Sequence, residues 1–182
     1  EKQLRSGYRT LVSQTLHDKV SPVLSGSLFL NNSALEIGPQ QVVLQDQTLQ
    51  APLVLRSQGW PIDSSIPIGY QKFFGLEVEL QDPHGLEGPI LMDATVPQID
   101  GFRFMYTLPF GPKLCLIEDT YYSDNPRLNF QNLEQECLRY ASNQGWKVHR
   151  IRRKEKGCLP LPLGGQPPLA NGAIGMASGL FH

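Results

Sequence analysis

Cysteine, long apolar stretches and an excess of charge of either sign are all scarce in this sequence of 182 residues. The three cysteines show no Cys-x-x-Cys spacing and the four histidines are scattered, which argues against a disulfide scaffold and against a metal site. No stretch approaches the ~18 apolar residues of a membrane span, and no signal-peptide pattern opens the chain. We therefore expect free thiols in a reducing cytoplasm, no metal, and a protein that is soluble or peripheral to a membrane.

The charge of the chain is low as well as balanced. Its 16 basic and 17 acidic side chains leave a net charge of −1, which argues against a generic nucleic-acid binder. Charged residues make up 18% of the chain against a usual ~25%, so an unusually apolar surface or interior is expected. The 17 glycines and 15 prolines favour strands and turns over a helical bundle.

The first part of the chain predicts one helix and a small sheet. Apolar residues recur at helical spacing between Leu4 and Leu16, which predicts an amphipathic helix over residues 6–18 that ends at Ser21-Pro22. Short β-type segments separated by turn residues follow at residues 27–30, 34–37, 41–44 and 49–55. A stretch rich in Pro, Gly and Ser over residues 57–69 then indicates a domain boundary.

The second part predicts an antiparallel sheet with one helix. Alternating strands are expected at residues 76–81, 89–96, 101–108 and 113–122. A helical stripe then runs from Phe130 to Ala141, and Gly145 stands where a glycine commonly follows a helix. Residues 146–151 predict a further strand, and the proline-interrupted segment 159–165 predicts an edge strand. The glycine-rich residues 170–182 are expected to bring their backbone close to another group.

Two adjacent acids, Glu118 and Asp119, are the candidate catalytic groups. A regular strand places Glu118 on the face of Thr120 and Asp119 on the opposite face, so only one of them can serve a given pocket. A carboxyl among apolar neighbours has a raised pKa and can act as a general acid near neutrality. The alternative is a pair of strand-end acids, one solvated and the other paired with Arg103 on the neighbouring strand.

A series of motifs gives the chain a resemblance to a known family. The most specific motif is Ile117-Glu118-Asp119-Thr120, with Tyr122 two residues further on. Further blocks lie in order at residues 69–77, 83–86, 89–96, 101–109, 145–146, 157–160 and 179–182. From about Gly69 to the C-terminus, these blocks resemble those of the bacterial-type lycopene beta-cyclases, which are FAD-dependent carotenoid cyclases.

The resemblance implies a fold and a division into domains. It implies an α/β protein, of α+β character over this chain, in which part of a Rossmann-type FAD-binding domain joins an antiparallel-sheet substrate domain, as in aromatic-hydroxylase-like flavoproteins. Residues 1–59 would be the remainder of the FAD-binding domain, residues 60–165 the substrate domain, and residues 166–182 a segment returning to the FAD domain. The Gly-x-Gly-x-x-Gly loop that binds the FAD pyrophosphate does not occur here. Together with the missing initial Met, this suggests an internal fragment that is inactive by itself.

The resemblance also implies a reaction and its partners. The reaction is the non-redox isomerisation of lycopene to beta-carotene, with reduced FAD required but not consumed and NADPH as the reductant. The expected partners are lycopene, related carotenoids and a membrane surface, which indicates a cytoplasmic protein peripherally associated with the membrane. The resemblance assigns the acid role to Glu118, and we expect Asp119 to orient the strand that carries it. Gly179, Phe181 and His182 would contact the cofactor.

Other residues allow both a substrate-binding and a structural interpretation. Asp93 either lines the cavity or is a strand-end acid satisfied by backbone groups. Four aromatic residues either pack in the core or bind the polyene: Phe102, Phe104, Tyr106 and Tyr122. Residues 150–156, with five basic side chains and one acidic one, form either a solvated hairpin, which we favour, or a contact with anionic lipid headgroups.

Two other classes of protein stay open. Another flavoprotein of the same fold, such as a monooxygenase or a prenyl reductase, would not require an acid at Glu118. A fragment that only binds carotenoid is the other alternative. The sequence does not indicate how many rings are closed per substrate, which type of ring forms, or the oligomeric state.

Overall fold

The computed structural model describes residues 13–24, 28–60, 66–127, 130–164 and 172–180. The chain divides into two compact units, one formed by Glu1–Gly59 with Pro168–Leu180 and the other by Trp60–Pro167. Among the described residues, no helix combines the length and the apolar character needed to cross a membrane. The cysteines Cys115, Cys137 and Cys158 are free thiols, as the sequence predicts.

The first unit contains an exposed helix, α1 (Ser13–Leu24), in which no residue is buried. The helix continues through Pro22 to Leu24, so the predicted end at Ser21-Pro22 is wrong. Proline removes one N–H donor, which would have bonded the carbonyl four residues earlier, at Asp18; this residue is exposed, so water can take the place of that donor. The predicted start at residue 6 lies outside the described residues.

A three-stranded antiparallel sheet follows, with the order β1 (Glu36–Ile37), β2 (Gln41–Val43) and β3 (Thr48–Gln50). It confirms the predicted meander with shorter strands. The strand predicted over residues 49–55 ends at Gln50, because Pro52 has no N–H to continue the ladder. Residues 28–30 form no strand; they lead into a turn in which Asn31 has a φ of 58°.

The glycine-rich end of the chain packs on the backbone of its own unit. A Cβ atom at Gly172 would lie 2.2 Å from the carbonyl oxygen of Val54, so only glycine allows this approach. The N–H of Arg56 donates to the Gly172 carbonyl (2.8 Å), and the N–H of Ile174 donates to the Arg56 carbonyl (2.9 Å). A single 3₁₀ turn, η1 (Gly175–Ser178), follows.

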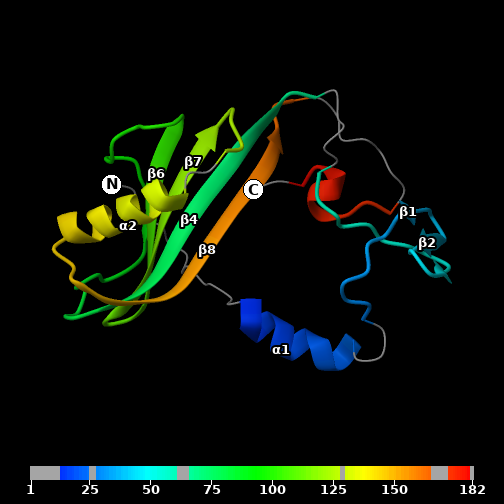
Figure 1. Ribbon diagram of the computed structural model, residues 1–182, viewed down its shortest axis with the longest axis horizontal. Helices are drawn as coiled ribbons and strands as arrows, with labels where there is room; N and C mark the ends of the chain where they lie inside the picture. The colour runs from blue at the N-terminus through cyan, green and yellow to red at the C-terminus, as the bar shows by residue number, and fades with distance from the viewer. Residues whose placement is uncertain (1–12, 25–27, 61–65, 128–129, 165–171, 181–182) are drawn as a thin grey trace. The chain divides into compact units, whose positions relative to one another are not determined.

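The second unit is a five-stranded antiparallel sheet, as the sequence predicts, with helix α2 (Phe130–Asn143) lying across one face (Figure 1). The strand order is β5-β6-β7-β4-β8. Its strands are β4 (Ile68–Leu80), β5 (Ile90–Asp93), β6 (Phe102–Gly111), β7 (Leu114–Ser123) and β8 (Val148–Pro162). Helix α2 ends as expected, with Gly145 at a φ of 78°. Both units together make a mixed α+β chain with antiparallel sheets.

Strand β8 corrects the interpretation of the basic segment. Residues 146–151 and 159–165 were expected to be two strands joined by a hairpin, but one strand runs from Val148 to Pro162. The cause is β4, whose 13 residues offer a partner along nearly the whole length of β8, with two register shifts that absorb the mismatch. Residues 150–156 therefore lie on an edge strand. The predicted hairpin is wrong, because the backbone does not turn within these residues.

The core lies between the sheet and α2. Alternate residues of the two central strands are buried there: Phe74, Leu76, Val78 and Leu80 of β4, with Cys115, Ile117 and Tyr121 of β7. Helix α2 contributes Leu133, Cys137, Tyr140 and Ala141. Below, the side of the sheet that carries α2 is the helix face, and the opposite side is the Glu118 face.

Candidate active site

Strand β7 separates the two candidate acids as its period of two requires. Asp119 has the parity of the buried Ile117 and Tyr121 and therefore lies on the helix face. Glu118 lies on the other side, where its ladder partners are Tyr106 on β6 and Gly75 on β4. The prediction that the two carboxyls serve different sides of the sheet is confirmed.

The Glu118 carboxyl sits in a largely desolvated position. Thr120 is fully buried beside it, and its hydroxyl donates a hydrogen bond to Glu118 Oε1 (2.9 Å). Burial raises the pKa of Glu118 from its ordinary 4.5 to about 7, the hydrogen bond from Thr120 opposes that rise, and the charge of Glu155 adds to it. A large fraction of Glu118 is therefore protonated at neutral pH, which a proton donor requires.

The Asp119 carboxyl is the centre of a buried polar network. Arg103 on β6 donates to both of its oxygens, from Nε (2.8 Å) and Nη2 (2.9 Å), and the Tyr121 hydroxyl adds a third bond (2.8 Å). Arg103 Nη2 also donates to Glu136 of α2 (2.7 Å). Although burial lowers the pKa of Arg103, the bonds and charge of Asp119 and Glu136 raise it above its usual value. The ion pair between Asp119 and Arg103, named above as the structural alternative, is thus present.

The four aromatic residues flank Glu118 on its own face. Phe104 is fully buried, whereas Phe102 is 47% and Tyr122 38% exposed. The rings of Phe102 and Tyr122 stack with centroids 6.4 Å apart, and Tyr106 meets Phe104 edge-on at 5.2 Å. Residues of a simple core would all be buried, so this cluster combines a buried ring with rings that are open to a ligand.

Asp93 lies away from Glu118. It ends β5 opposite Met105, and its carboxyl accepts bonds from the Thr95 N–H (3.0 Å), the Thr95 hydroxyl (2.6 Å) and the Tyr140 hydroxyl of α2 (2.8 Å). Burial raises its pKa, but these bonds outweigh it and lower the pKa below its usual value. Asp93 therefore has partners on the helix side of the sheet, and the structure does not bring it together with Glu118.

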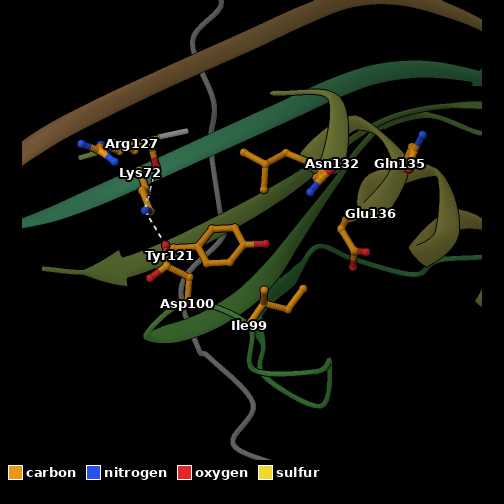
Figure 2. Close-up of a pocket in the computed structure, with 9 residues that line it drawn as sticks. Lys72, Ile99, Asp100, Tyr121, Arg127, Asn132, Gln135 and Glu136 are labelled. Atoms are coloured by element: carbon orange, nitrogen blue, oxygen red, sulfur yellow. Dashed lines mark hydrogen bonds and ion pairs between the residues drawn. The ribbon is translucent and has the colours of Figure 1, made fainter. Parts of the chain in front are cut away.

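A cavity of about 460 Å³ opens on the helix side of the same unit (Figure 2). Lys72, Asp100, Tyr121 and Glu136 are among the residues that line it. The Lys72 ammonium is almost completely buried and donates to Asp100 Oδ2 (2.6 Å) and to the carbonyls of Asn125 and Arg127. All three N–H donors of the Lys72 ammonium are thus paired. The cavity therefore has an apolar and charge-paired wall, and it lies on the side of the sheet away from Glu118.

Of the residues expected to contact FAD, Gly179 alone lies in the part of the chain that the structure describes. Gly179 closes η1 with a φ of 80°, and its N–H donates to the Met176 carbonyl (3.1 Å). Phe181 and His182 lie outside the described residues. The neighbouring glycine segment is occupied by the backbone of Val54 and Arg56, as described above. We therefore assign no step of a reaction to the flavin.

Sequence reasoning missed Glu155 and the importance of Gly75. Glu155 is the single acid of the basic segment, and nothing in its spacing indicates a role in the site. It pairs with Gly75 across the ladder of β4 and β8, and Gly75 pairs with Glu118 on its other side. Only the pairing of β4 with both strands, which residue spacing does not contain, places these residues together.

The fold and the site define a class of protein: an antiparallel-sheet unit that presents a carboxyl of raised pKa on an aromatic face. The family model for the lycopene cyclase protein matches residues 1–182. The chain is 38% identical to the lycopene beta-cyclase of Pantoea ananas over 189 residues, covering 100% of this chain and 49% of that protein. It is also 38% identical to the lycopene beta-cyclase of Paracoccus sp., covering 100% of this chain and 48% of that protein.

More distant similarity extends to plants. The capsanthin/capsorubin synthase of Citrus sinensis is 30% identical over 129 residues, covering 63% of this chain and 25% of that protein. No solved structure matches the chain. The chain belongs to the lycopene cyclase family, and it spans about half the length of the bacterial relatives described here.

Proposed function

We propose that the full-length protein is a lycopene beta-cyclase in which Glu118 donates the proton that starts ring closure. Membership of the family supports the substrate class. One observation carries the role of Glu118: its carboxyl is half-buried on an aromatic face, with a pKa of about 7. Because the chain spans about half of its relatives, the activity is proposed for the whole protein and not for this chain alone.

The chemistry of the substrate explains why a carboxylic acid is needed. Lycopene is a hydrocarbon without a heteroatom, so a catalyst can act on it only through a carbon–carbon double bond. Protonation of the terminal double bond by Glu118 gives a tertiary carbocation, attack by the next double bond closes a six-membered ring, and loss of a ring proton ends the reaction. One proton enters and one leaves, so the product is an isomer and the reaction has no net redox change.

The aromatic cluster supports the same reaction. The rings of Tyr106 and Tyr122, which pack on the buried Phe104, would provide electron-rich surfaces near Glu118 that stabilise a carbocation without trapping it. Phe102 and Tyr122 are partly exposed and would contact the polyene chain. Asp93, bonded to Tyr140 on the other side of the sheet, has no contact with the substrate in this proposal.

Asp119 has a positioning role in this proposal. It faces away from the aromatic cluster, and its bonds with Arg103 tie β7 to β6. Through Arg103, the same network reaches Glu136 on α2. Asp119 thus holds the strand that carries Glu118 and does not contact the reacting atoms.

The cofactor and the location of the full-length protein are proposals that rest on the resemblance. We propose that it binds FAD in the reduced form, with NADPH as the reductant, in a Rossmann-type domain of the aromatic-hydroxylase-like arrangement. Bound reduced FAD would supply negative charge near the carbocation. We also propose a cytoplasmic protein at the membrane surface, since its substrate dissolves in lipid. In the basic segment of β8, Arg150 and Lys154 pair with Glu79 and Glu134, which lowers the net positive charge that this segment offers to anionic lipids.

The test is expression of the full-length protein in cells that accumulate lycopene. The unaltered protein is expected to convert lycopene to beta-carotene, and Glu118→Gln is expected to lower the rate at least about a hundredfold, the usual contribution of a general acid. Glu79→Gln is the matched control, since Glu79 lies on the same face but pairs with Arg150, and it is expected to retain activity. Pigment analysis by chromatography measures the outcome.

Two results would contradict the proposal in different ways. Ring closure that persists in Glu118→Gln would show that this residue is not the proton donor. Consumption of NADPH in proportion to product would indicate a monooxygenase or a prenyl reductase instead.

A further inference from the structure

Glu118, Gly75 and Glu155 form one row across three neighbouring strands of the sheet. Gly75 of β4 pairs with Glu118 of β7 on one side and with Glu155 of β8 on the other. Directly paired residues of antiparallel strands project to the same face. Both glutamates therefore project from the Glu118 face, and the residue between them has no side chain.

The space above Gly75 is filled by the side chains of Glu155 and Leu116. A Cβ atom at Gly75 would lie 2.9 Å from Glu155 Cγ, 3.2 Å from Glu155 Oε1 and 3.2 Å from Leu116 Cδ1. The Glu155 side chain thus lies over the glycine, in the direction of Glu118. The two glutamates are two strand spacings apart, roughly 10 Å between their Cα atoms, so their carboxyls approach each other only because no side chain stands between them.

The two carboxyls have different partners. Glu155 Oε2 accepts a hydrogen bond from Arg153 Nη1, and Arg153 Nε also donates to Glu77 Oε2 (3.2 Å). Glu118 accepts a hydrogen bond from a neutral donor, the Thr120 hydroxyl. A guanidinium favours the charged form of the carboxyl it pairs with, so this arrangement favours Glu118 as the holder of a proton that the two glutamates share.

The groups that face Glu118 agree with this assignment. They are Tyr106 from β6, Glu77 from β4, and Arg153 and Glu155 from β8. Burial is the largest contribution to the raised pKa of Glu118, and both the charge and the hydrogen bonding of Glu155 raise it further. A negative charge on one carboxyl disfavours ionisation of a carboxyl close to it.

We propose that Glu155 is a positioning residue that shares a proton with Glu118 across Gly75 and keeps Glu118 in the acid form. This inference rests on the proposed function. When Glu118 transfers its proton to the less substituted carbon of the terminal double bond, a tertiary carbocation forms and the pair becomes doubly anionic. The pair then recovers one proton from the closed ring, so the count of protons returns to its starting value without a co-reactant.

The experiment is the pH profile of ring closure by the full-length protein with Glu155→Gln. Only the protonated form of Glu118 is active, so activity of the unaltered protein is expected to fall above about pH 7. Removal of the Glu155 charge lowers the pKa of Glu118, which moves this fall to lower pH. At a pH above the Glu118 pKa of both proteins, Glu155→Gln is expected to be about tenfold less active for each unit by which its Glu118 pKa is lowered. At the acid end of the profile, its activity is expected to equal that of the unaltered protein.

Gly75→Ala is a second, independent variant. Its Cβ displaces Glu155 and presses on Leu116 Cδ1, and it is expected to shift the profile in the same direction. Glu79→Gln, which removes a carboxylate from the same face of β4, is the control and is expected to leave the profile unchanged. The carboxylic-acid C=O band in the infrared spectrum gives a readout without turnover: it is expected to be lost in Glu118→Gln and to titrate at lower pH in Glu155→Gln.

The outcomes separate the two proposals. Normal activity of Glu118→Gln overturns the proposed function itself. An inactive Glu118→Gln together with an unshifted profile in Glu155→Gln overturns only the role of Glu155. An equal loss of activity at every pH in Glu155→Gln shows a structural role and also overturns the inference.

Discussion

At the scale of single residues, neighbouring acids of one strand differ in their partners. Asp119 is completely buried, which raises its pKa, and the hydrogen bonds and charge of Arg103 oppose that rise. Glu118 is partly exposed and accepts a hydrogen bond from the neutral Thr120 hydroxyl, and burial together with Glu155 favours its protonated form. Two consecutive residues of β7 thus have different roles: Asp119 belongs to a structural ion pair, and Glu118 is the candidate proton donor.

The ion pair predicts a specific effect on stability. Asp119→Asn leaves the Arg103 guanidinium, 1% exposed, with only the partly exposed Glu136 to balance its charge, so the free energy of unfolding is expected to fall by about 3 kcal/mol. The double variant Arg103→Met with Asp119→Leu removes both charges, so its free energy of unfolding is expected to fall by less than that of Asp119→Asn. Urea unfolding measures both values, and a double variant less stable than Asp119→Asn would contradict this account.

At the scale of elements, the junction of β6 with β7 sets the aromatic cluster. Phe102 begins β6 and pairs with Tyr122, and the preceding Gly101 has a φ of 72°. A Cβ atom at Gly101 would lie 2.1 Å from the Tyr122 carbonyl oxygen. The close approach of these two backbones therefore requires glycine for both its conformation and its size.

Gly85 allows a matched test of this element, because it has the same φ of 72° and nothing lies near its Cβ position. Gly85→Ala is expected to lower the free energy of unfolding by about 1 kcal/mol, because alanine is strained in the left-handed conformation and meets nothing else there. The alanine of Gly101→Ala must also displace the β7 backbone. This variant is therefore expected to lower the free energy of unfolding by at least about 2 kcal/mol more than Gly85→Ala does. Equal losses in thermal or urea unfolding would mean that the contact with Tyr122 is relieved at no cost.

At the scale of the whole molecule, the chain consists of two units with different contents. The Trp60–Pro167 unit contains the sheet, the buried core and both candidate acids. The other unit has short strands and an exposed helix. The groups expected to act on the substrate thus belong to one unit, and those expected to contact FAD belong to the other or lie outside the described residues.

This division predicts how the chain handles flavin. Purified by itself, the 182-residue chain is expected to retain far less than one FAD per chain, because it has no Gly-x-Gly-x-x-Gly loop and its glycine segment packs on Val54 and Arg56. The full-length protein is expected to retain flavin. Absorbance after gel filtration compares the two, and tight stoichiometric flavin in the chain alone would overturn the domain interpretation.

Several features of the sheet could be predicted from residue order alone. Alternation along residues 114–122 assigned Glu118 and Asp119 to opposite faces, and the structure confirms this. Turn residues and the apolar stripe predicted the strand order in sequence and the helix near Phe130–Asn143. These features depend on neighbours within a few positions, so local periodicity is enough to reveal them.

Other features were decided only by the tertiary structure. Pairing of β8 with β4 along 13 residues turned a predicted hairpin into one strand, and it placed Glu155 beside Glu118 across Gly75. The sequence determined that Glu118 is an acid on an apolar, aromatic face. It did not determine which charge lies next to that acid, because this depends on the register between strands that are 37 or more residues apart in the chain, from Glu118 to Glu155.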